Sequence, residues 1–231
     1  MDNRYYFSNI NENIVTITGG EAQHLTRVRR AKVGDEIVAF NGDGYNYFLV
    51  VQEILKDKVV CNVTQKVMNK ATKDNNITVY LSMIKNDALT TAIDNLAEIN
   101  VKKVKLFKSD FSVAVIDEKK LEKLNQIAIQ ASKQSERADI MEISIINKKD
   151  IEKDCKQMEN VFFAYENSNN KLTTFNGDFA VIIGPEGGFS EQENEYFSSF
   201  AKNISLGNTI LRAEVACVAS VSMLKAVSNE G

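Results

Sequence analysis

The sequence has little of several residue types on which metal sites and secreted proteins depend. Its 231 residues contain one histidine, which excludes a metal site built from several histidines of one chain. Cys61, Cys155 and Cys217 are odd in number and far apart, with no CxxC pair, and this predicts reduced, mostly buried thiols. The N-terminus has no hydrophobic signal region, and no apolar run approaches the roughly 20 residues of a membrane helix. We therefore expect a soluble cytoplasmic protein with no membrane segment and no metal.

The charge balance excludes a general attraction to nucleic acid. Lysine and arginine total 28 and aspartate and glutamate total 31, which gives a net charge of −3. Any RNA or DNA site must therefore be a local patch. The sequence is 44% hydrophobic and 26% charged, a composition typical of folded globular proteins, and its length suits one large domain or two small ones.

The hydrophobic pattern changes within the polar stretch 68–76. Before it, short β-branched and aromatic runs separated by glycine turns predict a small barrel or sandwich, with one helix over 21–30. After it, strand and helix patterns alternate, which predicts an α/β domain with a parallel sheet. We expect two domains, 1–68 and 74–231. In the second, strands are expected at 77–84, 104–107, 161–165, 179–183 and 203–206, and helices at 87–99, 118–137 and 213–227, with another starting at the capping box 190–193.

A glycine-rich loop at 184–190 is the most informative local signal. It leads from a buried strand into a capped helix, where ligands bind in open α/β sheets, and it holds the only proline, Pro185. It lacks the GxGxxG and GxxxxGK[ST] patterns, and Glu186 adds negative charge where a pyrophosphate needs donors. The loop therefore favours a cationic or neutral ligand, unless it is only a tight turn.

A second glycine loop, 205–214, contains Arg212 and Glu214 at the expected start of the last helix. The helix dipole favours Glu214 there by about 0.3–1 kcal/mol, and Arg212 could simply be its ion-pair partner. We expect the two glycine loops to follow adjacent strands of one sheet. They could therefore line a single pocket.

The two loops together resemble the RsmE family of 16S rRNA uridine methyltransferases, which belongs to the SPOUT superfamily. The resemblance rests on 184–190 and 206–216, with weaker likeness at His24-Leu25, Val28, Arg30, Gly34-Asp35, Ala131, Gln134, Ser135 and Arg137. It implies an α/β fold, with a C-terminal SPOUT α/β-knot (a deep trefoil knot with a parallel sheet) and a small N-terminal PUA-like β-barrel. It also implies a homodimer, for which the last helix offers Val215, Val218, Val221 and Leu224, although these could equally be core residues.

The resemblance further implies S-adenosylmethionine as the cofactor and N3 of uridine 1498 in the small ribosomal subunit as the methyl acceptor. The cofactor-binding positions would be Tyr165, Glu166, Ile183, Gly184, Pro185, Gly187, Gly188, Leu206, Gly207, Asn208, Ile210 and Leu211. Removal of the N3 proton leaves negative charge on uracil O2 and O4, which Arg212 could stabilise. Glu186 or Glu214 could orient this arginine or accept the proton, directly or through water.

A basic segment at residues 24–32 is the candidate RNA-binding surface, because phosphate contacts need clustered cations. The expected RNA-binding residues are Arg4, His24, Arg27, Arg29, Arg30, Lys32, Gln134 and Arg137. The alternative for the basic segment is a solvated helix end. The chain departs from the family pattern at Asn95, Asn100 and Phe111, where lysine, glycine and a basic residue are common, and this bears on the RNA target.

Other functions stay open at this point. The chain could methylate a different RNA, or it could be a non-catalytic RNA-binding protein that keeps the pocket as a scaffold. It could also be a small-molecule enzyme such as a phosphotransferase or dehydrogenase, although the phosphate motifs are missing. Binding of S-adenosylmethionine, or of ATP or NAD instead, separates these functions.

Overall fold

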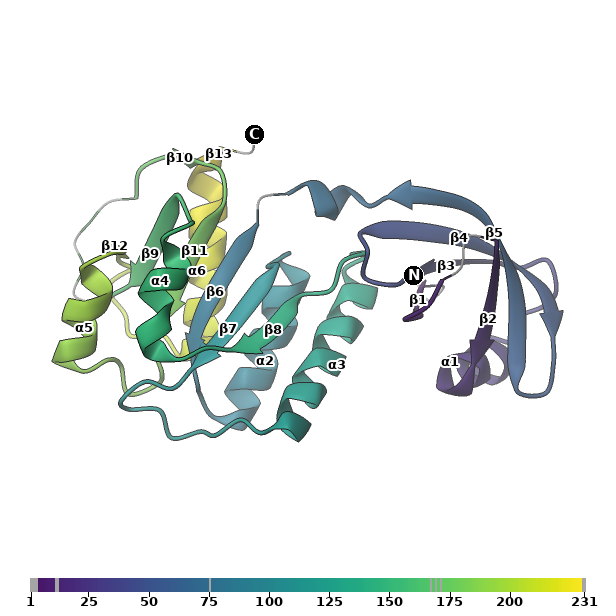
Figure 1. The fold of residues 1–231 in the computed structure, drawn as a ribbon, viewed down its shortest axis with the longest axis horizontal. Coiled ribbons are helices and arrows are strands. Elements are labelled where there is room, and N and C mark those ends of the chain that lie inside the picture. Colours follow the sequence, from purple (N-terminus) through teal and green to yellow (C-terminus); the bar gives the residue numbers. More distant parts are fainter. Residues whose placement is uncertain are drawn as a thin grey trace. The chain divides into compact units, whose positions relative to one another are not determined.

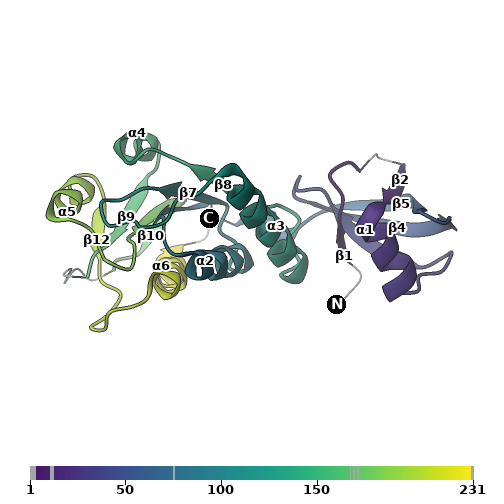
Figure 2. The ribbon, with the colours of Figure 1, turned by 90° about the horizontal axis from the view of Figure 1, so that it is seen from below.

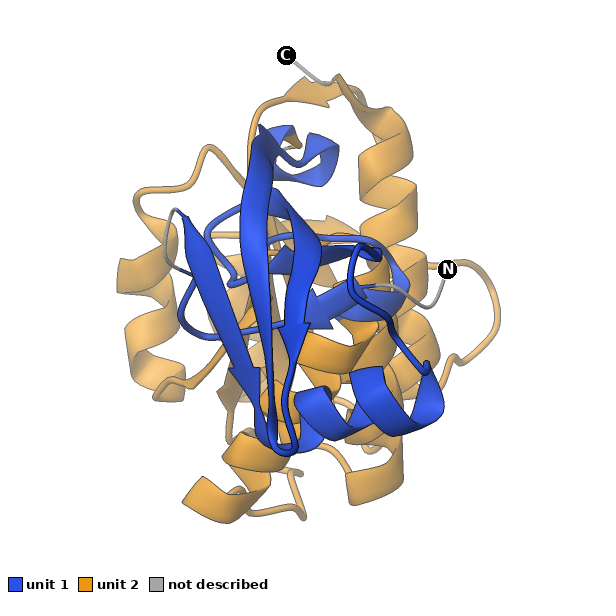
Figure 3. Cartoon of the chain, turned by 90° about the vertical axis from the view of Figure 1, so that its right-hand side faces the viewer, with its two compact units in different colours: residues 1–73, 132–140 blue, residues 74–131, 141–231 orange. Residues whose placement is uncertain are grey.

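The computed structural model describes residues 4–10, 13–74, 76–166, 168, 170 and 172–229. The chain forms two compact units, shown in different colours in Figure 3. Unit 1 comprises Met1–Lys73 and Ser132–Ile140, and unit 2 comprises Asp74–Ala131 and Met141–Gly231. The units divide between Lys73 and Asp74, inside the polar stretch 68–76, and residues 132–140 belong to unit 1.

Unit 1 is built on a sheet of five strands in the order β1-β3-β4-β5-β2 (Figure 1). The strands are β1 (Arg4–Tyr6), β2 (Ile14–Thr18), β3 (Glu36–Phe40), β4 (Tyr45–Ile54) and β5 (Lys58–Met68). Along β2 buried and exposed residues alternate, so that Val15 and Ile17 enter the core while their neighbours face solvent. The β-branched runs therefore form strands as expected, and β1 is an addition too short to show a pattern.

The helix expected over 21–30 is replaced by two short helical turns. α1 (Gly19–Gln23) continues directly into a π-helical turn at His24–Val28. Leu25 is buried in the core of unit 1, whereas Arg27 is exposed. Arg30 adopts a φ of 53°, a conformation that helices do not continue through. One buried leucine thus anchors a segment whose basic side chains mostly remain at the surface.

The segment 132–140 is held in unit 1 by hydrogen bonds between residues far apart in the sequence. Asn69 Nδ2 donates to the carbonyl of Glu136 at 2.8 Å. Arg4 Nη2 donates to the carbonyl of Arg137 at 2.6 Å. Hydrogen bonds between residues far apart in the chain produce no periodic pattern of hydrophobic residues in the sequence. The sequence therefore predicted that this segment belongs to the second domain.

Unit 2 contains a parallel sheet in the order β12-β9-β11-β6-β7-β8. Its strands are β6 (Ile77–Ser82), β7 (Lys103–Phe107), β8 (Glu142–Ile145), β9 (Asn160–Ala164), β11 (Phe179–Ile183) and β12 (Lys202–Ile204). Every residue of β6 and β11 is buried, as expected for apolar runs covered on both faces. The expectation that β11 and β12 are adjacent is wrong, because β9 lies between them. A separate short pair joins β10 (Phe175–Asn176) and β13 (Ser228–Asn229).

Helices cover both faces of this sheet (Figures 1 and 2). α2 (Asn86–Glu98) and α6 (Ala213–Val227) pack against each other on one face. α4 (Ile151–Cys155) and α5 (Glu191–Ser198) contribute to an aromatic-rich core on the other. The remaining helical elements are α3 (Glu118–Gln134) and the 3₁₀ turns Lys70–Lys73 and Lys148–Asp150. Among the residues described, no helix is long and apolar enough to cross a membrane.

The apolar residues of α6 lie in two different environments. Val221 and Leu224 are fully buried in unit 2, so they are core residues. Val215 is exposed, which leaves it available to a partner. The helix therefore offers a smaller candidate dimer surface than its sequence suggested.

The three cysteines are buried and free, as expected. Burial raises the pKa of Cys61 and that of Cys155 to about 11. At neutral pH these thiols are therefore protonated and poor nucleophiles. They act as small core residues.

Candidate functional site

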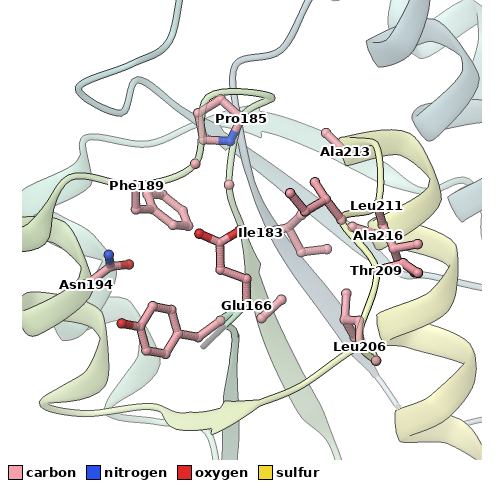
Figure 4. Close-up of a pocket in the computed structure, with 16 residues that line it drawn as sticks. Glu166, Ile183, Pro185, Phe189, Asn194, Leu206, Thr209, Leu211, Ala213 and Ala216 are labelled. Carbon is pink, nitrogen blue, oxygen red and sulfur yellow. The ribbon is translucent and has the colours of Figure 1, made fainter. Parts of the chain in front are cut away.

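A cavity of about 130 Å³ opens where three loops of unit 2 meet (Figure 4). The loops follow β9, β11 and β12, whose parallel arrangement brings their carboxyl ends to one edge of the sheet. The lining consists of Ala164, Tyr165, Glu166, Ile183, Gly184, Pro185, Gly188, Phe189, Asn194, Leu206, Gly207, Thr209, Ile210, Leu211, Ala213 and Ala216. All the expected cofactor positions except Gly187 and Asn208 are among them. The glycine loops therefore do line one pocket, with the loop after β9 contributing as well.

Sequence reasoning missed several lining residues. Phe189 and Thr209 lie inside the two glycine motifs, so the motifs themselves carried the signal. Asn194 is on α5, and Ala213 and Ala216 are on α6. Ala213 and Ala216 belong to the motif 206–216, whereas Asn194 reaches the pocket only because α5 packs beside the loops, and nothing in its local sequence indicates it.

Among the residues that the structure describes, the pocket lining is mostly apolar side chains and loop backbone, with no lysine or arginine. The carboxylate of Glu166 extends into it, between Phe189 and Ile183 in Figure 4. A carboxylate accepts hydrogen bonds and attracts positive charge. The pocket therefore suits a ligand with hydroxyl, amino or cationic groups, and it does not suit a polyphosphate.

Two glycines shape the loops at positions that exclude a larger residue. A Cβ on Gly184 would lie 2.9 Å from the Phe189 ring, so the ring packs there only because the side chain is missing. Gly207 has a φ of 111°, which strains any L-residue with a side chain. The space beside its Cα is open, and this leaves the backbone accessible to a ligand.

An ionic network fixes the point where the first glycine loop enters α5. Ser190 caps the helix by accepting from the Glu193 backbone N–H, and its hydroxyl donates to Asp110 at 2.6 Å. Lys148 bridges Asp110 at 2.6 Å and the buried Glu193 at 2.7 Å. Hydrogen bonds from Lys148 and Ser190 lower the pKa of Asp110. The network holds the loop in place without any ligand.

The expected catalytic residues lie beside the pocket and do not line it. Arg212 is exposed at the N-cap of α6, between the lining residues Leu211 and Ala213. Within the described residues it makes no ion pair with Glu214, which is half-buried in the first turn. Glu186 is exposed, and its carboxylate accepts from the Lys85 backbone N–H at 3.1 Å. Arg212 is thus free to act on a substrate, while Glu186 also holds its own loop.

The basic segment keeps most of its charged side chains at the surface of unit 1. His24, Arg27, Arg30 and Lys32 are exposed, and Arg29 is half-buried with a partner of its own. Gln134, which also belongs to unit 1, is exposed too. These positions can meet a phosphate backbone without rearrangement.

Two residues expected to bind RNA form their side-chain contacts within unit 1. Arg137 is only 1% exposed, and its guanidinium pairs with Asp139 at 3.1 Å. Arg4 is half-buried, donates to Asn46 Oδ1 at 2.8 Å and lies over the Phe40 ring at 4.8 Å. Desolvation by burial lowers the pKa of Arg4. Both arginines therefore make structural contacts inside unit 1, and their expected contact with RNA stays a prediction. Within the described ranges, no three potential metal-ligating side chains gather into one group.

Comparison with known proteins identifies two family domains. Residues 71–225 match a model described as an RNA methyltransferase domain, and residues 17–64 match an RNA methyltransferase PUA domain. The ribosomal RNA small subunit methyltransferase E of Helicobacter pylori strain J99 is 32% identical over 215 residues, which cover 90% of this chain and 92% of that protein. The protein of the same name from Rickettsia conorii is 27% identical over 227 residues, covering 93% and 90%.

Solved structures match the whole fold. The crystal structure of a ribosomal RNA small subunit methyltransferase E from Neisseria gonorrhoeae, bound to S-adenosyl methionine, matches with a TM-score of 0.80 at 22% identity and covers 97% of each chain. The expected parallel α/β methyltransferase domain with an N-terminal PUA-like domain is thus confirmed. The chain belongs to the ribosomal RNA small subunit methyltransferase E family of RNA methyltransferases.

Proposed function

We propose that this chain transfers a methyl group from S-adenosylmethionine to N3 of a uridine in 16S rRNA, at position 1498, acting in the cytoplasm on the small ribosomal subunit. The observation that carries the proposal is the pocket formed by three loops, with its apolar lining and single carboxylate. Family membership supports the reaction class. A homodimer belongs to the same proposal, with the exposed Val215 at its surface.

The pocket residues fit the methyl donor by their chemistry. When bound, S-adenosylmethionine supplies a methyl group activated by a sulfonium cation. The Glu166 carboxylate would accept hydrogen bonds from its hydroxyl or amino groups, and the apolar lining of Ile183, Leu206 and Leu211 would hold its adenine. The open backbone at Gly207 lets a ligand approach closely.

Arg212 is the residue that we assign to the chemical step. Uracil N3 carries a proton, and its removal leaves negative charge on O2 and O4. A guanidinium beside the pocket stabilises that charge as it develops. Glu186 or Glu214 would orient Arg212 or accept the N3 proton, directly or through water.

The first test is calorimetric titration of S-adenosylmethionine into the chain and into two matched variants. Glu166→Gln should weaken binding about tenfold or more, because it removes a charged acceptor. Glu191→Gln changes an exposed carboxylate on α5 outside the pocket and should leave affinity unchanged. Absence of binding to the wild type would contradict the proposal, and binding of ATP or NAD in its place would point to another enzyme class.

The second test is transfer of a tritiated methyl group to small ribosomal subunits that lack the modification. Incorporation at one uridine N3 is the expected result. Cofactor binding with incorporation at another site would mean a different RNA target. Binding with no incorporation would favour a non-catalytic RNA-binding protein.

A further inference from the structure

The loop that follows β7 is held rigidly on both sides of one exposed aromatic ring. On one side, Asp110 is bound by Ser190 and Lys148. On the other, the Ser112 hydroxyl lies 2.9 Å from that of Ser82 and accepts from the Ser109 backbone N–H at 3.0 Å. These contacts fix the backbone on either side of residue 111. A side chain presented in this way loses little conformational freedom on binding.

The ring at this position is Phe111, which is 52% exposed. No ring of the described residues stacks on it, although the eight other phenylalanines of unit 2 pack into clusters. These are Phe107, Phe162, Phe163, Phe175, Phe179, Phe189, Phe197 and Phe200, all in contact with other rings. An exposed, rigidly mounted aromatic face has no role in the core that would explain it.

Phe111 lies directly beside the loop of the methyl-donor pocket. A Cβ on Gly187 would lie 3.4 Å from the Phe111 Cβ, so the two residues are in contact across the loops. Gly188, the next residue, lines the pocket. Glu186, on the other side of Gly187, is held by the Lys85 backbone N–H. The aromatic ring therefore stands at the rim of the pocket, one residue away from its lining.

We propose that Phe111 is the stacking surface for the uracil that receives the methyl group. The inference rests on the proposed function, because it concerns the acceptor of that reaction. Enzymes that modify a base in folded nucleic acid take it out of the stack and hold its face against an aromatic or apolar side chain. Phe111 offers such a face beside the donor pocket, on a backbone that is already fixed. Stacking leaves the N3 edge of the base free for methylation.

A single tryptophan reports this contact directly, because the chain has none of its own. The indole introduced by Phe111→Trp should stack on the base, so its fluorescence should be quenched when a short RNA with the target uridine is added. Val115→Trp places the same reporter at a 77% exposed position of the same loop and should be quenched far less. Replacing the target uridine by 5,6-dihydrouridine, whose ring is not aromatic but keeps N3–H, should remove most of the difference.

The kinetic counterpart separates stacking from cofactor binding. Phe111→Ala should lower kcat/KM for RNA about tenfold to a hundredfold, in line with the loss of one base–aromatic stack, with no change in the dissociation constant of S-adenosylmethionine. Phe111→Trp should retain most of the activity. The thermal midpoint of Phe111→Ala serves to verify that the fold is intact.

Several outcomes overturn the inference. Equal quenching of the two reporters, or unchanged RNA kinetics in Phe111→Ala, excludes stacking on the target base while leaving the methyltransferase intact. The indole at position 111 could instead become shielded from solvent as the protein concentration rises, with no change in fluorescence on addition of RNA. That result would mean that a second copy of the chain covers the ring. Selective quenching without methyl transfer by the wild type would support the stacking surface and contradict the proposed function.

Discussion

The pocket of unit 2 and the basic segment of unit 1, which we propose as the sites for S-adenosylmethionine and for RNA, would recognise these ligands by opposite means. The pocket is apolar and glycine-rich, is assembled from three loops far apart in the sequence, and has a single carboxylate in its lining. The basic segment is contiguous over nine residues, and most of its cations are exposed. A pocket of this kind depends on fixed geometry, whereas a cationic surface acts through charge that salt screens. The comparison predicts that damage to one region leaves the other region's ligand unaffected.

Arg212 gives the largest expected effect on turnover. Arg212→Ala should lower kcat about a hundredfold to a thousandfold, because it removes the cation that stabilises the uracil anion. Affinity for S-adenosylmethionine should not change, since Arg212 does not line the pocket. Single-turnover kinetics at saturating RNA measure the effect, and Arg212→Lys should recover part of it. Normal turnover in Arg212→Ala would remove this residue from the mechanism.

A substitution at Arg137 tests whether this arginine stabilises the fold or binds RNA. Arg137→Met removes the guanidinium that pairs with Asp139 and should destabilise unit 1 by about 3 kcal/mol, as expected when a buried ion pair is broken. Urea denaturation followed by circular dichroism measures the loss. Gln134→Met, at an exposed position three residues away, is the control and should change stability by less than about 0.5 kcal/mol. A stable Arg137→Met variant with weakened RNA binding would return Arg137 to the RNA surface.

The exposed cations of the basic segment should govern the salt dependence of RNA binding. Changing Arg27, Arg30 and Lys32 to glutamine should lower the slope of log K against log salt by about 2, at roughly 0.7 per single-stranded phosphate contact. Affinity for S-adenosylmethionine should be unaffected.

The matched control for the basic segment is the same change at Lys119, Lys123 and Lys149, which are exposed in unit 2. This control should leave the slope unchanged. A loss of both RNA and cofactor affinity in the first triple variant would contradict the division of labour between the units.

The network at the start of α5 gives the smallest expected effect, and it depends on pH. The pKa of Asp110 is lowered in the folded state, so its contribution to stability is present above the unfolded value of about 3.8 and is lost as the pH falls through the folded value. Asp110→Asn should therefore destabilise the protein at pH 6, by less than about 1 kcal/mol for so exposed a pair. At pH 3 the difference from the wild type should shrink, as urea midpoints would show. A difference that is constant with pH would mean that Asp110 acts through its shape and not through its charge.

The local patterns of the sequence were sufficient to predict most of the secondary structure. Dense apolar runs became the buried strands β6 and β11, and the Ser190–Glu193 spacing became a capping box. Both follow from interactions within a few residues, which a sequence displays directly. The helix expected over 21–30 shows the limit of such reasoning, because it takes π-helical geometry over His24–Val28 and does not continue through Arg30, whose φ is 53°.

Long-range contacts decided the roles that local patterns left open. Arg137 is an expected RNA-binding residue from its likeness to the family motif, yet it is buried beside Asp139 within a segment that joins unit 1. Phe111 was noticed only as a departure from the family pattern. Its exposure and its contact with Gly187 depend on how the loops after β7 and β11 meet.

The sequence by itself determined the fold class, the two glycine loops and the charged residues of the basic segment, since each is written in a contiguous stretch of chain. Only the tertiary structure decided that β9 separates the two loop-bearing strands and which arginines remain exposed. The physical reason is that packing and desolvation depend on contacts between residues distant in the chain, and such contacts produce no regular spacing in the sequence.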